Sequence, residues 1–189
     1  MQLAQIRARL TAWPTQAVSP VFKPDARAAA VLIPLIAHPT GLTVLFTQRT
    51  DHLHHHPGQI SFPGGRLESI DKSPEAAALR ETKEEIGLDA KHIELIARLP
   101  QYLTRTGFDI TPIVGVVSTP FELVLDSFEV AEAFEVPLSF FLEAKNWQQG
   151  VMIRDGVEHP YLSVQFGKRN IWGVTAGILE RFSKCLIGY

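Results

Sequence analysis

An uninterrupted apolar segment, "AAAVLIPLIAH" at residues 28–38, constrains the fold of this chain most strongly. A continuous run of aliphatic side chains is typical of a buried strand. The turn-forming "PTG" follows it, and "GLTVLFTQR" at residues 41–49 comes next. The two segments therefore predict a pair of strands.

The rest of the chain alternates irregularly between segments typical of strands and of helices. The predicted elements are a short strand near 60–62, a helix at about 74–86, strands at 93–100 and 109–117, a short helix in "FEVAEAFEVPL" that Pro137 stops, a hairpin around Asp155-Gly156, and a terminal helix in "VTAGILERFSKCL". This order favours an α/β (α+β) fold in which a mixed β-sheet is sandwiched between helices.

The length and composition predict one folded unit. With 189 residues, 46% of them hydrophobic, the chain can bury a core of ordinary size. We expect an N-terminal helix or arm at 1–26, a main domain at 27–160, and a C-terminal strand and helix at 161–189 that pack on the same domain. No repeat, low-complexity tract or linker interrupts the sequence.

Charge and cysteine content limit the classes of function. Eighteen basic and twenty acidic residues give a net charge of -2, which provides no broad attraction to nucleic acid or to an anionic membrane. The single cysteine, Cys185, has no partner for an internal disulfide. No apolar run approaches the roughly 20 residues of a membrane span, and no secretory signal begins the sequence. We therefore expect a cytoplasmic protein.

The segment "ALRETKEEIGL" at residues 78–88 places three carboxylates on one helix face. Glu81, Glu84 and Glu85 stand at positions i, i+3 and i+4, and Arg80 precedes Glu84 by four residues and can pair with it. Such a face is most often a solvated surface. Near a helix C-terminus, however, three carboxylates repel one another and face the negative end of the helix dipole, whereas a hard divalent cation such as Mg²⁺ would stabilise them.

The segment "GGRLESIDKSPEAAALRETKEEIGL" resembles the Nudix box, a motif of the form G-x5-E-x7-R-E-U-x-E-E-x-G-U in which U is apolar. The second half matches at Arg80, Glu81, Glu84, Glu85, Gly87 and Leu88. The first half departs from the motif: Gly65 is one residue too far from Arg80, Lys72 stands at the usual Glu position beside Asp71, and Thr82 replaces an apolar residue.

These departures, together with a second signature, resemble the coenzyme A diphosphatase branch of the Nudix family. That branch has the same one-residue expansion, an Asp in the box, and an upstream signature L-L-T-x-R-[S/A]-x3-R-x3-G-x3-F-P-G-G. Here the chain has "LFTQRTDHLHHHPGQISFPGG", which matches at Leu45, Thr47, Arg49, Gly58 and Phe62 to Gly65, and departs at Phe46, Thr50 and His54. Together the two signatures cover about residues 45–88.

The resemblance implies hydrolysis of a diphosphate, here that of coenzyme A, to 3',5'-ADP and 4'-phosphopantetheine. It implies Mg²⁺ or Mn²⁺ as cofactor, with metal ligands at Glu81, Glu85 and Glu84 and at the Gly65 carbonyl. Arg80 would orient a Glu. For the general base, Glu84, Glu81 and Glu129 remain alternatives.

The loops on either side of the predicted strands supply candidate substrate contacts. Arg49, His54, His56 and Arg105 are candidates to bind the substrate, and Tyr102 and Phe108 are further candidates for contacts to pantetheine or adenine. A zinc site in the histidine-rich loop at 52–56 is an alternative that lacks cysteine partners. Alternative functions are hydrolysis of ADP-ribose or another nucleoside-diphosphate substrate, or non-catalytic ligand sensing. We expect a monomer or homodimer.

Overall fold

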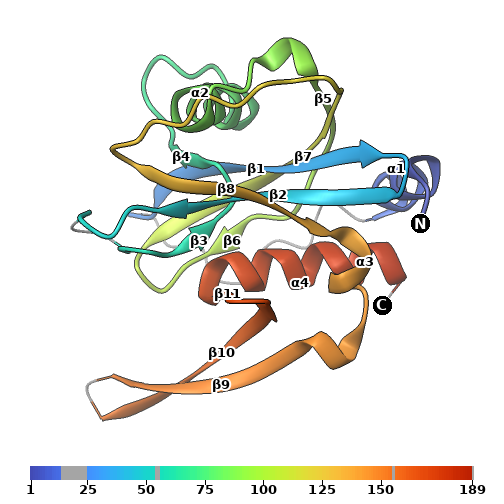
Figure 1. Ribbon diagram of the computed structural model, residues 1–189. Coiled ribbons are helices and arrows are strands. Elements are labelled where there is room, and N and C mark those ends of the chain that lie inside the picture. Colours follow the sequence, from blue (N-terminus) through green and yellow to red (C-terminus); the bar gives the residue numbers. More distant parts are fainter. Residues whose placement is uncertain (14–24, 54–55, 155, 189) are drawn as a thin grey trace.

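A mixed β-sheet lies between helices on its two faces, as the sequence predicts (Figure 1). The computed structural model describes residues 1–13, 25–53, 56–154 and 156–188. The elements are α1 (Leu3–Ala12), β1 (Arg27–His38), β2 (Gly41–Arg49), β3 (Ile60–Ser61), β4 (Gly64–Arg66), α2 (Pro74–Ile86), a 3₁₀ turn η1 (Ala90–His92), β5 (Ile93–Arg98), β6 (Tyr102–Leu103), β7 (Phe108–Val117), β8 (Val130–Pro137), α3 (Leu138–Phe141), a 3₁₀ turn η2 (Ala144–Asn146), β9 (Trp147–Arg154), β10 (Val157–Phe166), β11 (Arg169–Trp172) and α4 (Gly173–Ile187).

One parallel pairing brings the starts of two distant strands together. The strand order is β3-β2-β1-β7-β5, and β8 pairs with β2, β4 with β1 and β6 with β7. The pairing of β1 with β7 is parallel, with Arg27 opposite Phe108, whereas β2 and β4 pair antiparallel with β1. Consequently the starts of β1 and β7 lie at the same end of the sheet as the ends of β2 and β4 (Figure 1).

Helices α2 and α4 cover opposite faces of this sheet (Figure 1). Toward α4 the core is built around Phe46, whose ring stacks on Phe62 and Phe134 with centroids 5.0 and 5.8 Å away. Ala77 and Ala78 of α2 are fully buried against the other face. Their small side chains let the acidic helix lie close to the sheet, so its carboxylates approach the strands.

The segment 128–138 differs from its prediction. Instead of a short helix before Pro137, it forms the strand β8, which pairs antiparallel with β2 from Thr43 to Arg49. Glu and Ala favour helix locally, but the alternating Phe134 and Val136 are buried in the core beneath the sheet. Tertiary pairing therefore overrides helix propensity here.

The predicted hairpin forms from β9 and β10, which join β11 in a separate three-stranded sheet. The expected boundary between residues 160 and 161 falls inside β10, and the three-part division stays a prediction. In the expected N-terminal arm, α1 buries Ile6 and Leu10 in the core shared with α4, whereas residues 14–24 lie outside the described part. None of the described helices has the length and apolar content that a membrane crossing requires.

Replacing Phe46 with Ala is expected to lower the free energy of unfolding by about 3–5 kcal/mol, because the change leaves a cavity among Phe62, Phe134 and Phe141. Urea denaturation measures the loss. The control is Phe128→Ala, a ring that is 64% exposed and whose removal should change stability by no more than about 0.5 kcal/mol. Equal losses in the two variants would contradict this account of the core.

Candidate functional site

Helix α2 has the boundaries that its end signals predict. The Ser73 hydroxyl accepts a hydrogen bond from the Ala76 N–H at 3.3 Å, and Gly87 ends the helix in a left-handed conformation with φ of 71°. Thr82, which replaces an apolar residue of the motif, is fully buried and donates its hydroxyl hydrogen bond to the Ala78 carbonyl at 2.6 Å. Its polar atom is therefore satisfied within the helix.

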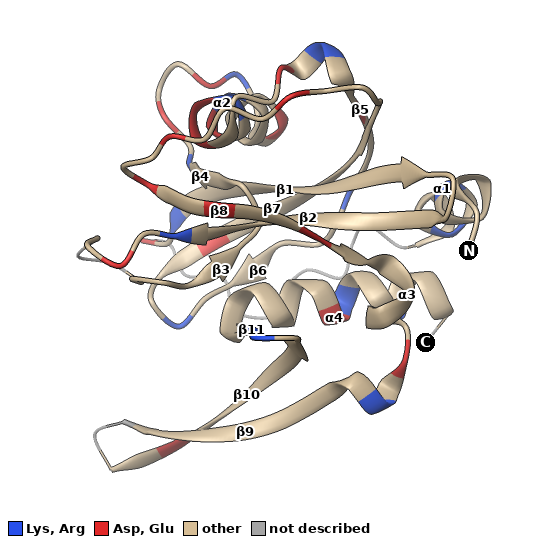
Figure 2. Cartoon of the chain, in the orientation of Figure 1, with Lys and Arg blue, Asp and Glu red and all other residues tan. Residues whose placement is uncertain are grey.

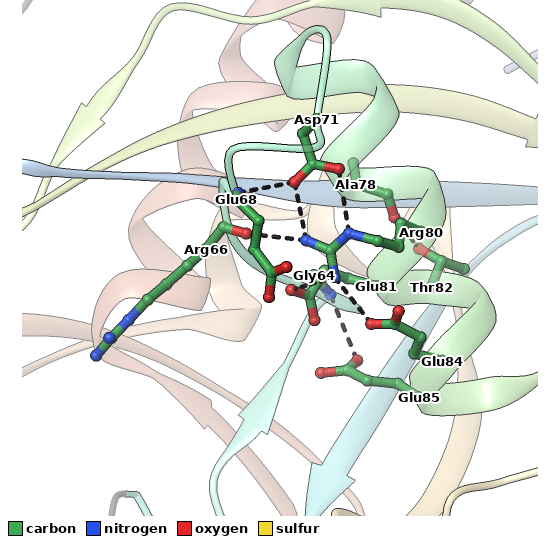
Figure 3. Close-up of polar contacts among 10 residues, drawn as sticks. All are labelled: Gly64, Arg66, Glu68, Asp71, Ala78, Arg80, Glu81, Thr82, Glu84 and Glu85. Atoms are coloured by element: carbon green, nitrogen blue, oxygen red, sulfur yellow. Dashed lines mark hydrogen bonds and ion pairs between the residues drawn. The ribbon is translucent and has the colours of Figure 1, made fainter.

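The three glutamates share one side of α2 but not one environment. Glu84 is largely exposed, the Glu81 side chain is 19% exposed, and Glu85 is 7% exposed. The i, i+3, i+4 spacing fixes their direction around the helix, and the sheet below determines how deeply each is buried. The three carboxylates, which Figure 3 shows on one side of α2, thus differ in burial from the exposed Glu84 to the nearly buried Glu85.

Arg80 links these glutamates to the loop before the helix (Figure 3). Its Nη1 donates to Glu84 at 2.8 Å, which confirms the predicted pair, and to Glu81 at 3.0 Å. Its Nε and Nη2 hold both oxygens of Asp71, at 3.1 and 2.9 Å, and Nη2 also donates to the Arg66 carbonyl at 3.1 Å. A single guanidinium therefore ties together the helix, the loop and the end of β4.

Asp71 is a residue of the candidate site whose pairing with Arg80 the sequence did not reveal. Its side chain is 4% exposed, and hydrogen bonds from Arg80 and from the Glu68 N–H hold its pKa below the usual range. The sequence did signal that Asp71 was unusual, since it stands where the Nudix motif departs from its general pattern. Its bidentate pairing with Arg80 required the structure, because the loop path between them is not a regular element.

The backbone of β4 lies directly against the carboxylates. A Cβ atom on Gly65 would come within 2.4 Å of the Glu81 Cδ, so a larger residue at this position would displace the Glu81 carboxylate. The Gly64 N–H donates a long hydrogen bond, 3.4 Å, to Glu85 Oε2. The predicted ligand Gly65 therefore lies beside Glu81, and its neighbour Gly64 contacts Glu85.

Burial disfavours the charged forms of the inner carboxylates. The pKa of Glu85 is raised to about 8, mainly by burial and in part by the nearby Glu81, against a weaker opposing effect of the Gly64 N–H. Burial likewise raises the pKa of Glu81, which the Arg80 hydrogen bond opposes. A pair of inner carboxylates beside an open glycine backbone is a donor set that suits a hard divalent cation.

Arg49 and Glu129 meet at the same end of the sheet. Arg49 Nη1 lies 3.7 Å from Glu129 Oε2, and the Thr50 N–H donates to the Glu129 carbonyl at 3.0 Å. The charge of Glu129 raises the pKa of both Glu81 and Glu85, and that of Arg49 lowers the pKa of Glu85, so the pair faces the carboxylates. It is the pairing of β8 with β2, rather than the expected helix, that brings Glu129 there.

The remaining predicted substrate residues are not joined to this cluster by any described contact. His54 lies outside the described residues. His56 is exposed with φ of 55°, and Arg105 is exposed with its Nη2 at 3.4 Å from His159 Nε2. Across residues 1–13, 25–53, 56–154 and 156–188, no three His, Cys, Asp or Glu side chains are gathered as a ready metal site. In the acidic cluster, the Arg80 guanidinium bonds to both Glu81 and Glu84.

The family model described as the NUDIX domain matches residues 26–148, more than half of the chain. The chain therefore belongs to the Nudix family and is a Nudix hydrolase, which agrees with the fold and with the acidic, arginine-linked helix. The activity of the class is hydrolysis of a diphosphate-linked substrate.

Relatives agree with this assignment. The chain is 39% identical to the uncharacterized Nudix hydrolase NudL of Enterobacter sp. (strain 638) over 158 residues, which cover 83% of this chain and 81% of the relative. Its counterpart in Yersinia pestis (strain Pestoides F) is 36% identical over 163 residues, which cover 86% and 81%. The crystal structure of the MutT protein from Methanosarcina mazei Go1 shares the fold, with a TM-score of 0.54 at 18% identity over 85% of this chain and 96% of that one.

Replacing Glu85 with Gln is expected to stabilise the metal-free protein at alkaline pH. On folding, the pKa of this carboxyl rises from 4.5 to about 8. Between these pH values the folded state keeps a proton that the unfolded state releases, so the free energy of unfolding falls as pH rises. The loss is as much as about 5 kcal/mol at full shift. In EDTA the variant should therefore melt several degrees above the wild type at pH 8, since about 1 kcal/mol moves the midpoint by about 2–4 °C. At pH 4 the two should melt together.

The matched control for this experiment is Glu84→Gln, since the Glu84 side chain is 59% exposed on the same helix. It should show no comparable gain between pH 4 and pH 8. A constant difference between wild type and Glu85→Gln across this pH range would show that the burial of Glu85 is not what costs stability.

Proposed function

We propose that this Nudix hydrolase acts on coenzyme A and its thioesters, and splits the diphosphate to yield 3',5'-ADP and 4'-phosphopantetheine. The observation that carries the proposal is that two signatures adjoin each other across residues 45–88. The upstream signature runs directly into the Nudix box. In the fold, β2 and β4 come from the upstream signature and α2 from the box, and they bring Arg49, Gly65 and Glu81 to one end of the sheet. This spatial convergence supports treating the two signatures as one site.

The chemistry of the residues present suits a divalent metal, although no three of the described acidic side chains are gathered around one point. Glu81, Glu85 and Glu84, with the Gly65 carbonyl, would hold Mg²⁺ or Mn²⁺. Members of this family typically use such a metal, which when bound would supply positive charge to the phosphoryl oxygens and lower the pKa of water. Arg80, fixed by Asp71, orients Glu81 and Glu84. A bound cation would relieve the mutual repulsion of the glutamates, and this relief would favour cation binding.

The chain offers three carboxylates as general base. Glu84 is the most exposed of the box glutamates, Glu81 lies against β4, and Glu129 stands across from them beside Arg49. A base must reach the proton that it removes, and each of these lies at the end of the sheet where the diphosphate would bind. Arg49 at this end would contact phosphate oxygens.

The expected cytoplasmic location, the absence of nucleic-acid and membrane partners, and a monomeric or homodimeric state accompany this proposal as predictions. So does the assignment of His54, His56 and Arg105 to substrate binding. Two other functions compete: hydrolysis of ADP-ribose or a similar nucleoside diphosphate, and ligand sensing without catalysis. Retention of Glu81, Glu84 and Glu85 disfavours the sensor, since a non-catalytic domain has no need for a repulsive carboxylate cluster.

The purified protein with Mg²⁺ or Mn²⁺ is expected to convert coenzyme A to 3',5'-ADP, which chromatography of the products measures. Glu85→Gln is the control for a contaminating hydrolase, and it should lose most activity while remaining folded. Brisk turnover of ADP-ribose without turnover of coenzyme A would favour the first alternative. Inertness toward both substrates would favour the sensor, and full activity in Glu85→Gln would contradict the metal assignment.

Comparison of Glu84→Gln with Glu129→Gln tests the general base. The substitution that removes the base should lower kcat by about 100-fold or more, leave KM little changed, and abolish the acidic limb of the kcat profile against pH. Loss of a metal ligand should instead be relieved in part by raised Mn²⁺ concentration. If neither variant loses the acidic limb, Glu81 remains the candidate.

A further inference from the structure

Two arginines stack on one aromatic ring at the end of the sheet that carries the proposed site. The Cζ of Arg27 lies 4.0 Å from the centroid of the Phe108 ring, and the Cζ of Arg66 lies 5.4 Å from the same centroid. They come from the start of β1, the end of β4 and the start of β7. The parallel register that sets Arg27 opposite Phe108, and the antiparallel register that sets Arg66 opposite Ala29, create this cluster.

The charge of this cluster is not neutralised within the described residues. Arg27 and Arg66 are both exposed, and neither forms an ion pair there. Arg27 Nη2 donates to the Thr106 carbonyl at 3.2 Å. Asp109 is the nearest carboxylate along β7, but side chains alternate along a strand, so it is directed to the opposite face from Phe108. Figure 2 shows basic segments where β1 starts and where β2 and β4 end, with acidic segments among them.

The cluster is separate from the carboxylates but connected to them through one strand. Gly65 faces Glu81, and the next residue, Arg66, sends its side chain away from the acidic cluster (Figure 3). The Arg66 carbonyl nevertheless accepts a hydrogen bond from Arg80. A ligand whose diphosphate lies against Gly65 can therefore extend past the end of β4 to the guanidinium of Arg66.

We propose that Arg27 and Arg66, stacked on Phe108, bind a phosphomonoester on the nucleotide part of the substrate, apart from the diphosphate that is split. Two guanidinium forks offer several donors to one dianionic phosphate. Stacking on the ring restricts their rotamers before the ligand binds, which lowers the entropy cost of binding. The inference rests on the proposed function: coenzyme A carries such a phosphate on its ribose, and ADP-ribose does not.

The kinetic test compares coenzyme A with the same molecule lacking the 3'-phosphate, on wild type, Arg27→Met, Arg66→Met and the double variant. Methionine keeps an apolar contact with the ring and removes the charge. Wild type should prefer coenzyme A by about tenfold or more in kcat/KM. The double variant should lose that preference through a higher KM for coenzyme A, with kcat/KM for the dephosphorylated compound within about twofold of wild type.

Arg181→Met is a matched control. Arg181 also stacks on a ring, with its Cζ 4.5 Å from the Tyr102 centroid, and also donates to a main-chain carbonyl, that of Gln101 at 3.1 Å, but it lies on α4. It should keep the wild-type preference. Equal losses on both substrates in the Arg27 and Arg66 variants, or a wild type without preference, would overturn the proposal even if coenzyme A is hydrolysed.

A binding test separates this proposal from the proposed function. Calorimetric titration with 3',5'-ADP and with 5'-AMP needs no turnover. Wild type should bind 3',5'-ADP about tenfold more tightly, and the double variant should bind the two ligands equally. If this binding result is obtained but coenzyme A is not hydrolysed, the phosphomonoester site is retained and the proposed diphosphatase activity is rejected. Equal affinities in wild type reject the site, whatever the enzyme hydrolyses.

Discussion

The bidentate pair between Arg80 and Asp71 holds the acidic side of this protein together. Three glutamates on little more than one turn of helix repel one another, and two of them are carried inward against β4. Arg80 is the cation that reaches both Glu81 and Glu84, and Asp71 fixes the plane of its guanidinium from the other side. Without Asp71 the guanidinium would be free to turn with the exposed Glu84, and Glu81 would lose a partner of fixed orientation. The acid within the box, Asp71, therefore has a structural role.

Local signals made α2 predictable to the residue, whereas β8 was not predictable in the same way. Ser73, Pro74 and Gly87 act within one helical turn, so their effects depend little on the rest of the chain. The strand at 130–137 depends on β2, more than eighty residues earlier, which offers a partner for its backbone. Alternation of Phe134 and Val136 was the available signal, but Glu and Ala between them favour helix in isolation. The error concerns a non-local contact, and that contact is what places Glu129 opposite the carboxylates.

Spacing along α2 predicted the direction of the glutamates but not their burial. Positions i, i+3 and i+4 put Glu81, Glu84 and Glu85 on one side, as helix geometry requires. The difference between exposed Glu84 and nearly buried Glu85 arises from β4, whose path depends on its pairing with β1. The sequence likewise does not indicate that Glu81 fills the space beside Gly65, because that contact depends on the packing of α2 on the sheet.

The short strand β4 contributes residues to both faces of the sheet, because side chains alternate along a strand. On one face the missing Cβ of Gly65 admits Glu81, and on the other the side chain of Arg66 reaches Phe108. Its backbone is anchored on both sides, by pairing with β1 and by the hydrogen bond from Arg80 to the Arg66 carbonyl. Three residues of extended chain therefore fix the distance between a carboxylate cluster that suits a cation and an arginine pair that suits an anion. A substrate with phosphates at two separated positions would match such a fixed spacing, and a substrate with a diphosphate alone would use only half of it.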